Sequence, residues 1–248
     1  MKGARIVTSI LQAVQAYFET PLSQCPFYYE KARLEQVKDG ALVYCTVSEE
    51  QPIGKAWELV CVDQLSPQLS CAHVCYDRED AFCDDILFFL KVNDGWKLIN
   101  LLRALTPAKF CSISSPIPEE VKAYEELAQA MRVYSTGLYE MDAELALTVF
   151  GSDARMNHPT DGISFADVSC TVFRERWAGF PPAEEAGLKE FMRVYGIDLL
   201  NANTALVKVG VAKLEDHFKD YLSCVKVDGK WVVAHKITQG LWKGTPIA

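Results

Sequence analysis

Two stretches of this 248-residue chain decide its fold: Asp220–Trp231 reads DYLSCVKVDGKW, and Asp85–Trp96 reads DILFFLKVNDGW. The two stretches align position by position without a gap, from Asp85 with Asp220 to Trp96 with Trp231. In the later stretch, Asp228-Gly229 separates two apolar runs, which predicts a tight β-hairpin. The identities between the stretches include Lys91/Lys226, Val92/Val227 and Trp96/Trp231.

A second set of matches lies earlier in the chain, again at a constant offset in numbering. These matches are Ala32–Leu34 with Ala154–Met156, Asp39-Gly40 with Asp161-Gly162, and Tyr17 with Tyr139. This offset is smaller than that of the later stretches, which predicts an insertion in the second copy between Gly162 and Leu206. Several matches at two constant offsets indicate a tandem duplication.

The residue pattern within each copy predicts an α+β fold, in which helices pack on a curved antiparallel sheet. In copy two, apolar residues recur at helical spacing from Tyr124 to Leu138, and Asp142 is a candidate N-cap for a short helix that reaches Phe150. Alternating strands follow, over 206–214, 218–227 and 231–237. We therefore expect two domains, at 1–106 and 118–248, with the insertion of the second near 170–200.

Composition excludes several classes of protein. The chain is 50% hydrophobic and 23% charged, and its formal net charge is −8, so it lacks the basic footprint of a nucleic-acid binder. No apolar run is long enough to span a membrane, and the N-terminus reads as an amphipathic helix rather than an export signal. Its nine cysteines are scattered without a CxxC pair, so we expect reduced thiols and a cytoplasmic protein.

The last hairpin, from Asp220 to Lys236, resembles that of the family described as putative lumazine-binding, a branch of the nuclear-transport-factor-2-like and SnoaL-like superfamily. The helix–strand junction of copy two, from Tyr139 to Ala154, is similar to that family as well. Copy one departs from the pattern, with Pro21 where its second helix should begin and Lys31 in place of Asp153. The resemblance implies two tandem cystatin-like cone domains, of which the first is degenerate.

Members of this superfamily isomerise, cyclise or dehydrate small molecules inside the cone, or only bind ligands or partners. The resemblance therefore implies three functions for this chain. The first is a small-molecule binding protein with its pocket in the second domain. The second is a cofactor-free enzyme that uses acid–base chemistry, and the third is a protein interaction module. The sequence does not decide whether the chain is an enzyme, nor whether its internal pseudo-dimer is a monomer or joins a homodimer.

Two residues of copy two are candidate catalysts. His235 shares strand parity with Trp231, so we expect it to face the core, where an imidazole could act as a general base. Asp220 shares parity with Phe218 and Leu222, which predicts an inward carboxylate. A core histidine bonded to protein, and a structural aspartate shared with Asp85, are the competing interpretations.

The other candidates are polar and aromatic residues that could line the pocket: Arg155, His158, Trp177, Tyr195, Tyr221 and Trp231. The pattern Cys71-Ala72-His73-Val74-Cys75 places three metal-ligand types on one face of a strand. A single flat strand cannot surround Zn²⁺ tetrahedrally, so buried thiols explain this pattern better. No metal and no cofactor are expected.

Overall fold

The computed structural model describes residues 2–24, 28–64, 66–78, 81–92, 95–106, 118–159, 165–187, 190–213 and 216–243. Residues 1–112 form most of one compact unit, and residues 113–158 with 165–248 form the other. We call them the first and the second unit. The domain limits at 106 and 118 stay a prediction, because residues 107–117 lie outside the described residues.

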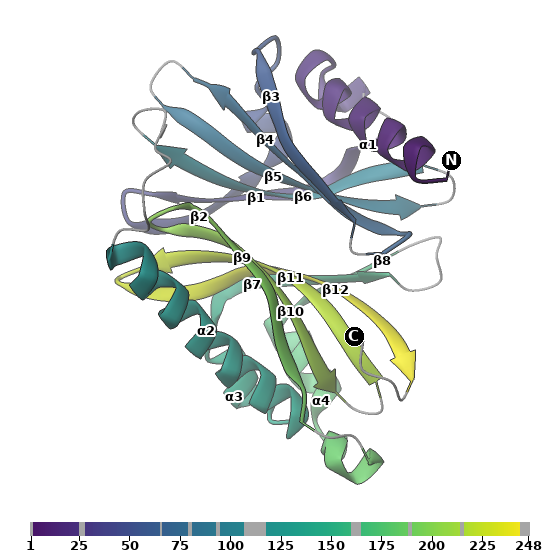
Figure 1. The fold of residues 1–248 in the computed structure, drawn as a ribbon, viewed down its shortest axis with the longest axis vertical. Helices are drawn as coiled ribbons and strands as arrows, with labels where there is room; N and C mark the ends of the chain where they lie inside the picture. The colour runs from purple at the N-terminus through teal and green to yellow at the C-terminus, as the bar shows by residue number, and fades with distance from the viewer. Residues whose placement is uncertain are drawn as a thin grey trace. The chain divides into compact units, whose positions relative to one another are not determined.

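The first unit combines one long helix with a six-stranded sheet (Figure 1). In chain order its elements are α1 (Lys2–Glu19), η1 (Leu22–Gln24), β1 (Tyr28–Lys38), β2 (Ala41–Thr46), η2 (Val47–Glu50), β3 (Trp57–Gln64), β4 (Leu69–Asp77), β5 (Phe82–Val92) and β6 (Gly95–Thr106). Ile10, Val14 and Tyr17 turn one face of α1 into the core, as their helical spacing predicts.

The second unit carries more helix around a sheet of the same size. Its elements are α2 (Pro118–Tyr139), α3 (Ala143–Leu147), β7 (Phe150–Pro159), β8 (Phe165–Ser169), α4 (Cys170–Trp177), η3 (Ala183–Ala186), β9 (Met192–Asn201), β10 (Thr204–Lys213), β11 (Asp216–Val227) and β12 (Lys230–Lys243). The side chain of Asp142 accepts a hydrogen bond from the Leu145 amide and caps α3, which is shorter than predicted because Phe150 already begins β7. The predicted insertion supplies α4 and η3.

The two sheets have the same topology. Their strand orders are β2-β1-β6-β5-β4-β3 and β8-β7-β12-β11-β10-β9. In each sheet the first long strand pairs in parallel with the last, as β1 does with β6 and β7 does with β12. Identical order, including this crossover, confirms the tandem duplication and the α+β fold of both halves.

Tight turns fix the hairpins at matching points. Asp39-Gly40 joins β1 to β2, and Asp228-Gly229 joins β11 to β12. All four residues have positive φ, between 49° and 79°, as a two-residue hairpin turn of the primed type requires. The corresponding Asp161-Gly162 lies outside the described residues. Across the helices that the structure describes, none has the length and apolar character needed to cross a membrane.

Candidate functional site

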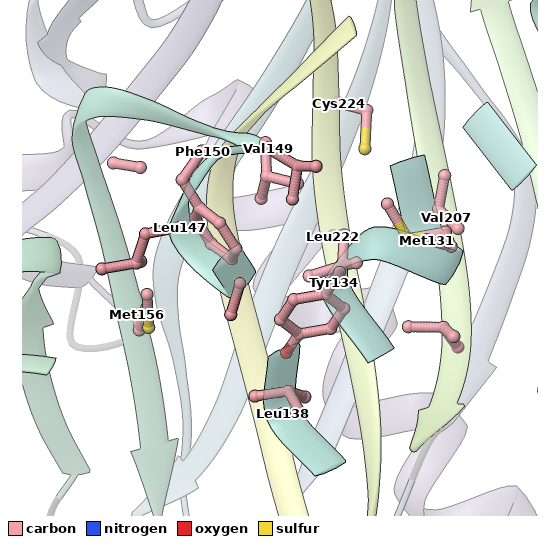
Figure 2. Packing of buried hydrophobic residues seen from close by; sticks show 14 of the residues in the cluster. Met131, Tyr134, Leu138, Leu147, Val149, Phe150, Met156, Val207, Leu222 and Cys224 are labelled. Carbon is pink, nitrogen blue, oxygen red and sulfur yellow. The ribbon is translucent and has the colours of Figure 1, made fainter. Parts of the chain in front are cut away.

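The face of the second sheet that packs against α2 carries the core of the second unit. We call this side of a sheet, in either unit, its inner face, and the opposite side its outer face. Figure 2 shows Tyr134 of α2 among apolar side chains of this core, with Leu222 and Val207 from the sheet and Leu138 from the helix itself. Any polar group on this face is therefore held in apolar surroundings.

A β-bulge on β12 decides which residues reach the inner face. Cys224 pairs with Val233, but the next residue of β11, Ser223, pairs with His235, so Ala234 is the extra residue. Side chains alternate along a strand, and one extra residue reverses the alternation. Trp231 and Val233 thus point inward before the bulge, whereas Lys236 points inward after it, opposite Leu222.

Four side chains of the inner face form a buried polar network. The hydroxyl of Tyr134 donates to Oδ2 of Asp220 at 2.6 Å, and Nζ of Lys236 donates to the Tyr134 oxygen. Nζ of Lys236 also lies 3.3 Å from Oδ2 of Asp220. The hydroxyl of Thr238 donates to Oδ1 of the same carboxylate. The network joins an amine, a phenol, a hydroxyl and a carboxylate within an apolar core.

Aromatic rings surround the amine of this network. Nζ of Lys236 lies 5.2 Å from the ring centre of Tyr134 and 5.7 Å from that of Phe173, which belongs to α4. Phe173 packs on Trp177, one turn further along the same helix, with ring centres 3.9 Å apart. The insertion therefore places two aromatic side chains over the inner face, next to the polar network.

The electrostatics of the network keep the phenol in its neutral form. Burial, followed by the charge of Asp220 and the hydrogen bond to it, raises the pKa of Tyr134 well above its ordinary value. Tyr134 is therefore a hydrogen-bond donor at neutral pH, held between an amine and a carboxylate. An arrangement of this kind can donate hydrogen bonds to a ligand oxygen, or move a proton to and from it.

In the first unit the equivalent carboxylate is already saturated. Asp85 receives Nε and Nη2 of Arg103, each at 2.8 Å, and the hydroxyl of Tyr76 at 3.0 Å. Asp85 and Arg103 are both 0% exposed. Nη2 of the same guanidinium also donates to the hydroxyl of Tyr17. This bidentate ion pair occupies the middle of the inner face in the first unit.

Three of the eight predicted site residues lie on the inner face of the second unit, and a fourth lies at its end. Asp220 points inward beside Phe218 and Leu222, as its parity predicts. Trp177 and Trp231 belong to the buried core, 4% and 7% exposed. His158 follows Met156 by two positions at the end of β7, where it is half-buried.

The predicted inward orientation of His235 is wrong, because the bulge at Ala234 breaks its parity with Trp231. His235 instead points to the outer face, where its Nε2 lies 2.7 Å from Oδ1 of Asn157. The first unit has the same bulge at Ile99 and a matching pair, in which Nδ2 of Asn100 donates to Oε1 of Glu35 at 2.7 Å. These pairs are equivalent features of the two outer faces.

Three further predicted residues also lie on the outer face. Arg155 is held by Asp167, with Nε 2.9 Å from the carboxylate. Tyr221 alternates with Asp220 and Leu222 and therefore points away from them. The ring of Tyr195 lies against Gly210, where a Cβ atom would come within 3.0 Å of it. None of the three joins the network of Tyr134, Asp220 and Lys236 through a hydrogen bond within the described part of the chain.

Sequence reasoning missed Lys236, Thr238 and the role of Tyr134. Tyr134 falls within the apolar stripe of its helix, so its spacing indicates only core packing. When the alignment of Asp85 with Asp220 is continued, Lys236 matches Leu101, and a lysine in place of a core leucine is a signal that could have drawn attention. The bulge leaves no such signal in the sequence.

The cysteine-rich strand of the first unit offers no converging ligand set. Cys71, His73 and Cys75 lie on the outer face of β4, because Ala72 and Val74 face the core. Nε2 of His73 lies 3.0 Å from Oδ1 of Asp84. Throughout the described part of the chain, no three histidine, cysteine or acidic side chains are placed to share a metal ion.

Residues 122–238 match the model of the family described as "Putative lumazine-binding". The second unit is a member of that family. This match covers α2, the inner-face network and the last hairpin up to Thr238. A search of proteins with curated descriptions found no match to the chain.

Solved structures similar to half of this chain include several of the nuclear-transport-factor-2-like type. One is a protein of unknown function from Silicibacter pomeroyi, 16% identical over 49% of this chain and 98% of its own, with a TM-score of 0.44. Another, from Shewanella baltica, is 18% identical over 52% and 100%, with a TM-score of 0.45. A putative scytalone dehydratase from Novosphingobium aromaticivorans is 14% identical over 52% and 91%, with a TM-score of 0.38.

Proposed function

We propose that the second unit binds a small apolar or aromatic molecule on its inner face, beneath α2 and α4. The observation that carries this proposal is the buried network of Lys236, Tyr134, Asp220 and Thr238 in an otherwise apolar core. Ligand sites are usually apolar walls with a few placed polar groups. Phe173 and Trp177 would form the walls, and the network would hold the polar end of the ligand.

The contrast with the first unit supports a role beyond packing. A buried ion pair contributes little to stability compared with apolar side chains of similar volume. The first unit has Leu101, 0% exposed, where the second has Lys236. Since leucine serves the core at this position, the lysine has a purpose that packing does not supply.

The donors of the network define the class of ligand. Lys236 and Tyr134 can both donate to an oxygen atom, and aromatic rings lie beside them. A planar ring system with a carbonyl or carboxylate oxygen fits these features. Lumazine, the compound in the family's description, has fused planar rings with carbonyl oxygens and is therefore the first probe to test.

Acid–base catalysis is the second candidate function. It is favoured by the position of the Tyr134 hydroxyl between an amine and a carboxylate. In ketosteroid isomerase, a well-known example, a tyrosine and an aspartic acid donate hydrogen bonds to an enolate oxygen. Here Asp220 would accept the proton, while Lys236 and Tyr134 would stabilise the negative charge that develops on the substrate oxygen.

The binding proposal is tested by titrating lumazine into the full chain in a calorimeter. We expect Lys236→Met and Tyr134→Phe to weaken binding about tenfold or more, which corresponds to about 1.4 kcal/mol. His235→Asn is the matched control, because it changes the outer face to the residue that the first unit carries. Equal affinity in wild type and Lys236→Met, with both proteins folded by circular dichroism, would refute the inner-face site.

Catalysis is tested with a β,γ-unsaturated ketone, whose conjugated isomer absorbs in the ultraviolet. We expect Asp220→Asn to abolish turnover while lumazine still binds, because the amide cannot accept the proton. If wild type binds the ketone without converting it, the second unit is a binding protein and the catalytic candidate is wrong.

A further inference from the structure

One segment of the first unit exposes large apolar side chains close together. Ile53 is 49% exposed, Leu59 36% and Val60 55%. Three of the seven exposed large hydrophobic residues in the described part of the chain thus fall between positions 53 and 60. Clustered apolar exposure of this kind indicates an interaction surface rather than ordinary surface.

Leu59 and Val60 belong to β3, which is an edge strand. The sheet of the first unit ends at β3, and β3 pairs on one side only, with β4. An edge strand presents backbone donors and acceptors that another extended chain can pair with. The pairing with β4 shifts between Leu59 and Cys61, so Val60 is a bulge residue, and the stretch from Trp57 to Leu59 stays regular.

A pocket of about 620 Å³ opens at the beginning of this strand. Trp57 and Phe18 form its aromatic wall, with nearly parallel rings 5.1 Å apart, and Ile53 contributes an apolar rim. The amide of Gly54 donates to the carbonyl of Phe18 at 2.8 Å, which ties the loop to the end of α1. The pocket and the strand edge therefore belong to one fixed surface.

The equivalent edge of the second unit is built differently. In β9 the fully exposed positions are the charged residues Arg193 and Asp198. Charged residues on an edge strand discourage pairing with other chains. The segment before β9 is also longer, and Ala183 of η3 within it is 0% exposed. The first unit has neither the charges nor the insertion at this edge.

We propose that β3 and the adjoining pocket bind an extended peptide segment of another protein by strand addition. The peptide would pair with the backbone of residues 57–59 and place one large apolar or aromatic side chain against Trp57. Main-chain hydrogen bonds give affinity in this mode of recognition, and pockets for alternate side chains give specificity.

Charge identifies the kind of peptide. The strand and the pocket carry the acidic residues Glu19, Glu58 and Asp63, against one base, Lys55. Basic side chains on the peptide complement this surface. A second copy of this chain is a poor partner, because it presents the same acidic edge and carries a net charge of −8.

The test uses a displayed library of random nine-residue peptides, selected against the full chain. We expect the selected peptides to alternate large apolar residues with other residues and to be enriched in lysine and arginine. A selected peptide is then labelled, and its binding is followed by fluorescence anisotropy. Val60→Lys and Ala56→Trp should each weaken binding about tenfold, because they charge the edge and fill the pocket.

Val172→Lys is the control, because it places the same charge at an exposed position of the second unit, 37% exposed in wild type. It should bind the peptide as wild type does. The proposal is overturned if the selected peptides lack the alternating basic pattern, or if they bind Val60→Lys as tightly as wild type. It is also overturned if sedimentation shows a dimer of wild type that Val60→Lys abolishes, since the edge would then belong to a second copy.

Discussion

The two units place an aspartate at the same point of the same strand pair and satisfy it in different ways. Asp85 lies opposite Arg103, whose guanidinium binds both carboxylate oxygens. Asp220 lies opposite Thr238, and it is also bound by Tyr134 and Lys236. In the second unit the cation has moved by one inward-facing position along the strand and comes from a lysine.

This difference shows how a duplicated fold can hold chemistry in one copy only. A guanidinium stays charged and fixes a carboxylate bidentately, so the first unit gains a rigid centre. An amine and a phenol are single donors, and both can exchange protons or turn toward another oxygen. The position is equivalent, but only the second unit has groups there that a ligand could engage.

Removing the guanidinium should have the largest effect on this comparison. Arg103→Met leaves the buried Asp85 charge with Tyr76 alone, and breaking a buried ion pair from one side costs about 3–5 kcal/mol. We expect a loss of this size in the free energy of unfolding of the first unit, measured in urea. Arg103→Met with Asp85→Leu, which removes both charges, should recover most of it. A loss below about 1 kcal/mol in the single variant would show that the ion pair does not hold the first unit together.

The outer faces give a second contrast, between Glu35 in the first unit and Asn157 in the second. Burial raises the pKa of Glu35 from 4.5 to about 8. The folded state therefore keeps a proton that the unfolded state loses above pH 4.5. Stability should fall by about 1.4 kcal/mol per unit of pH across this window, and level off above pH 8.

Glu35→Gln gives the first unit an uncharged amide, as Asn157 does in the second. We expect this variant to lose the pH-dependent fall and to be more stable than wild type at pH 7.5. Urea unfolding at pH 5.5 and 7.5 measures both. Parallel pH dependence in wild type and Glu35→Gln would show that Glu35 is not the group responsible.

Sequence periodicity and the repeat predicted the fold well because both depend on local, regular features. The gapless alignment of the two hairpin stretches placed Asp220 over Asp85, and the tight turn at Asp228-Gly229 needs only the residues themselves. The candidate site was predicted less well. Parity counts assume an uninterrupted strand, and the bulge at Ala234 reversed the orientation of every residue after it.

The contribution of α2 to the site was also out of reach of the sequence. Tyr134 lies 86 residues before Asp220, and no local pattern joins them. A buried tyrosine on an apolar stripe is indistinguishable from core packing until the partner of its hydroxyl is known. A comparison of the two copies at Leu101 and Lys236 is the one route by which the sequence could have led to the network.

Gly137 tests the helical difference between the units. The second unit packs α3 on α2 at this glycine, where an added Cβ would lie closer than 3.0 Å to the backbone of Ala146. The first unit has only the short turn η1 after Pro21. We expect Gly137→Ala to destabilise the second unit by about 2 kcal/mol, as overpacking does. Gly196→Ala is the control, since nothing lies within 4 Å of its added Cβ. Thermal unfolding of both variants would contradict close packing if their midpoints agreed.

The smallest effect on stability should come from Lys236→Met. Methionine nearly conserves the volume of the lysine stem, and Asp220 keeps the hydroxyls of Tyr134 and Thr238 as donors. We expect a loss of about 1 kcal/mol in urea unfolding, well below that of Arg103→Met, because a carboxylate with two remaining hydrogen bonds is not left bare. A large loss would mean that Lys236 is a structural counter-ion like Arg103, and the two units would then differ in residue type but not in role. A small loss, together with weakened ligand binding, would separate the roles: Arg103 holds its unit together, and Lys236 serves a ligand.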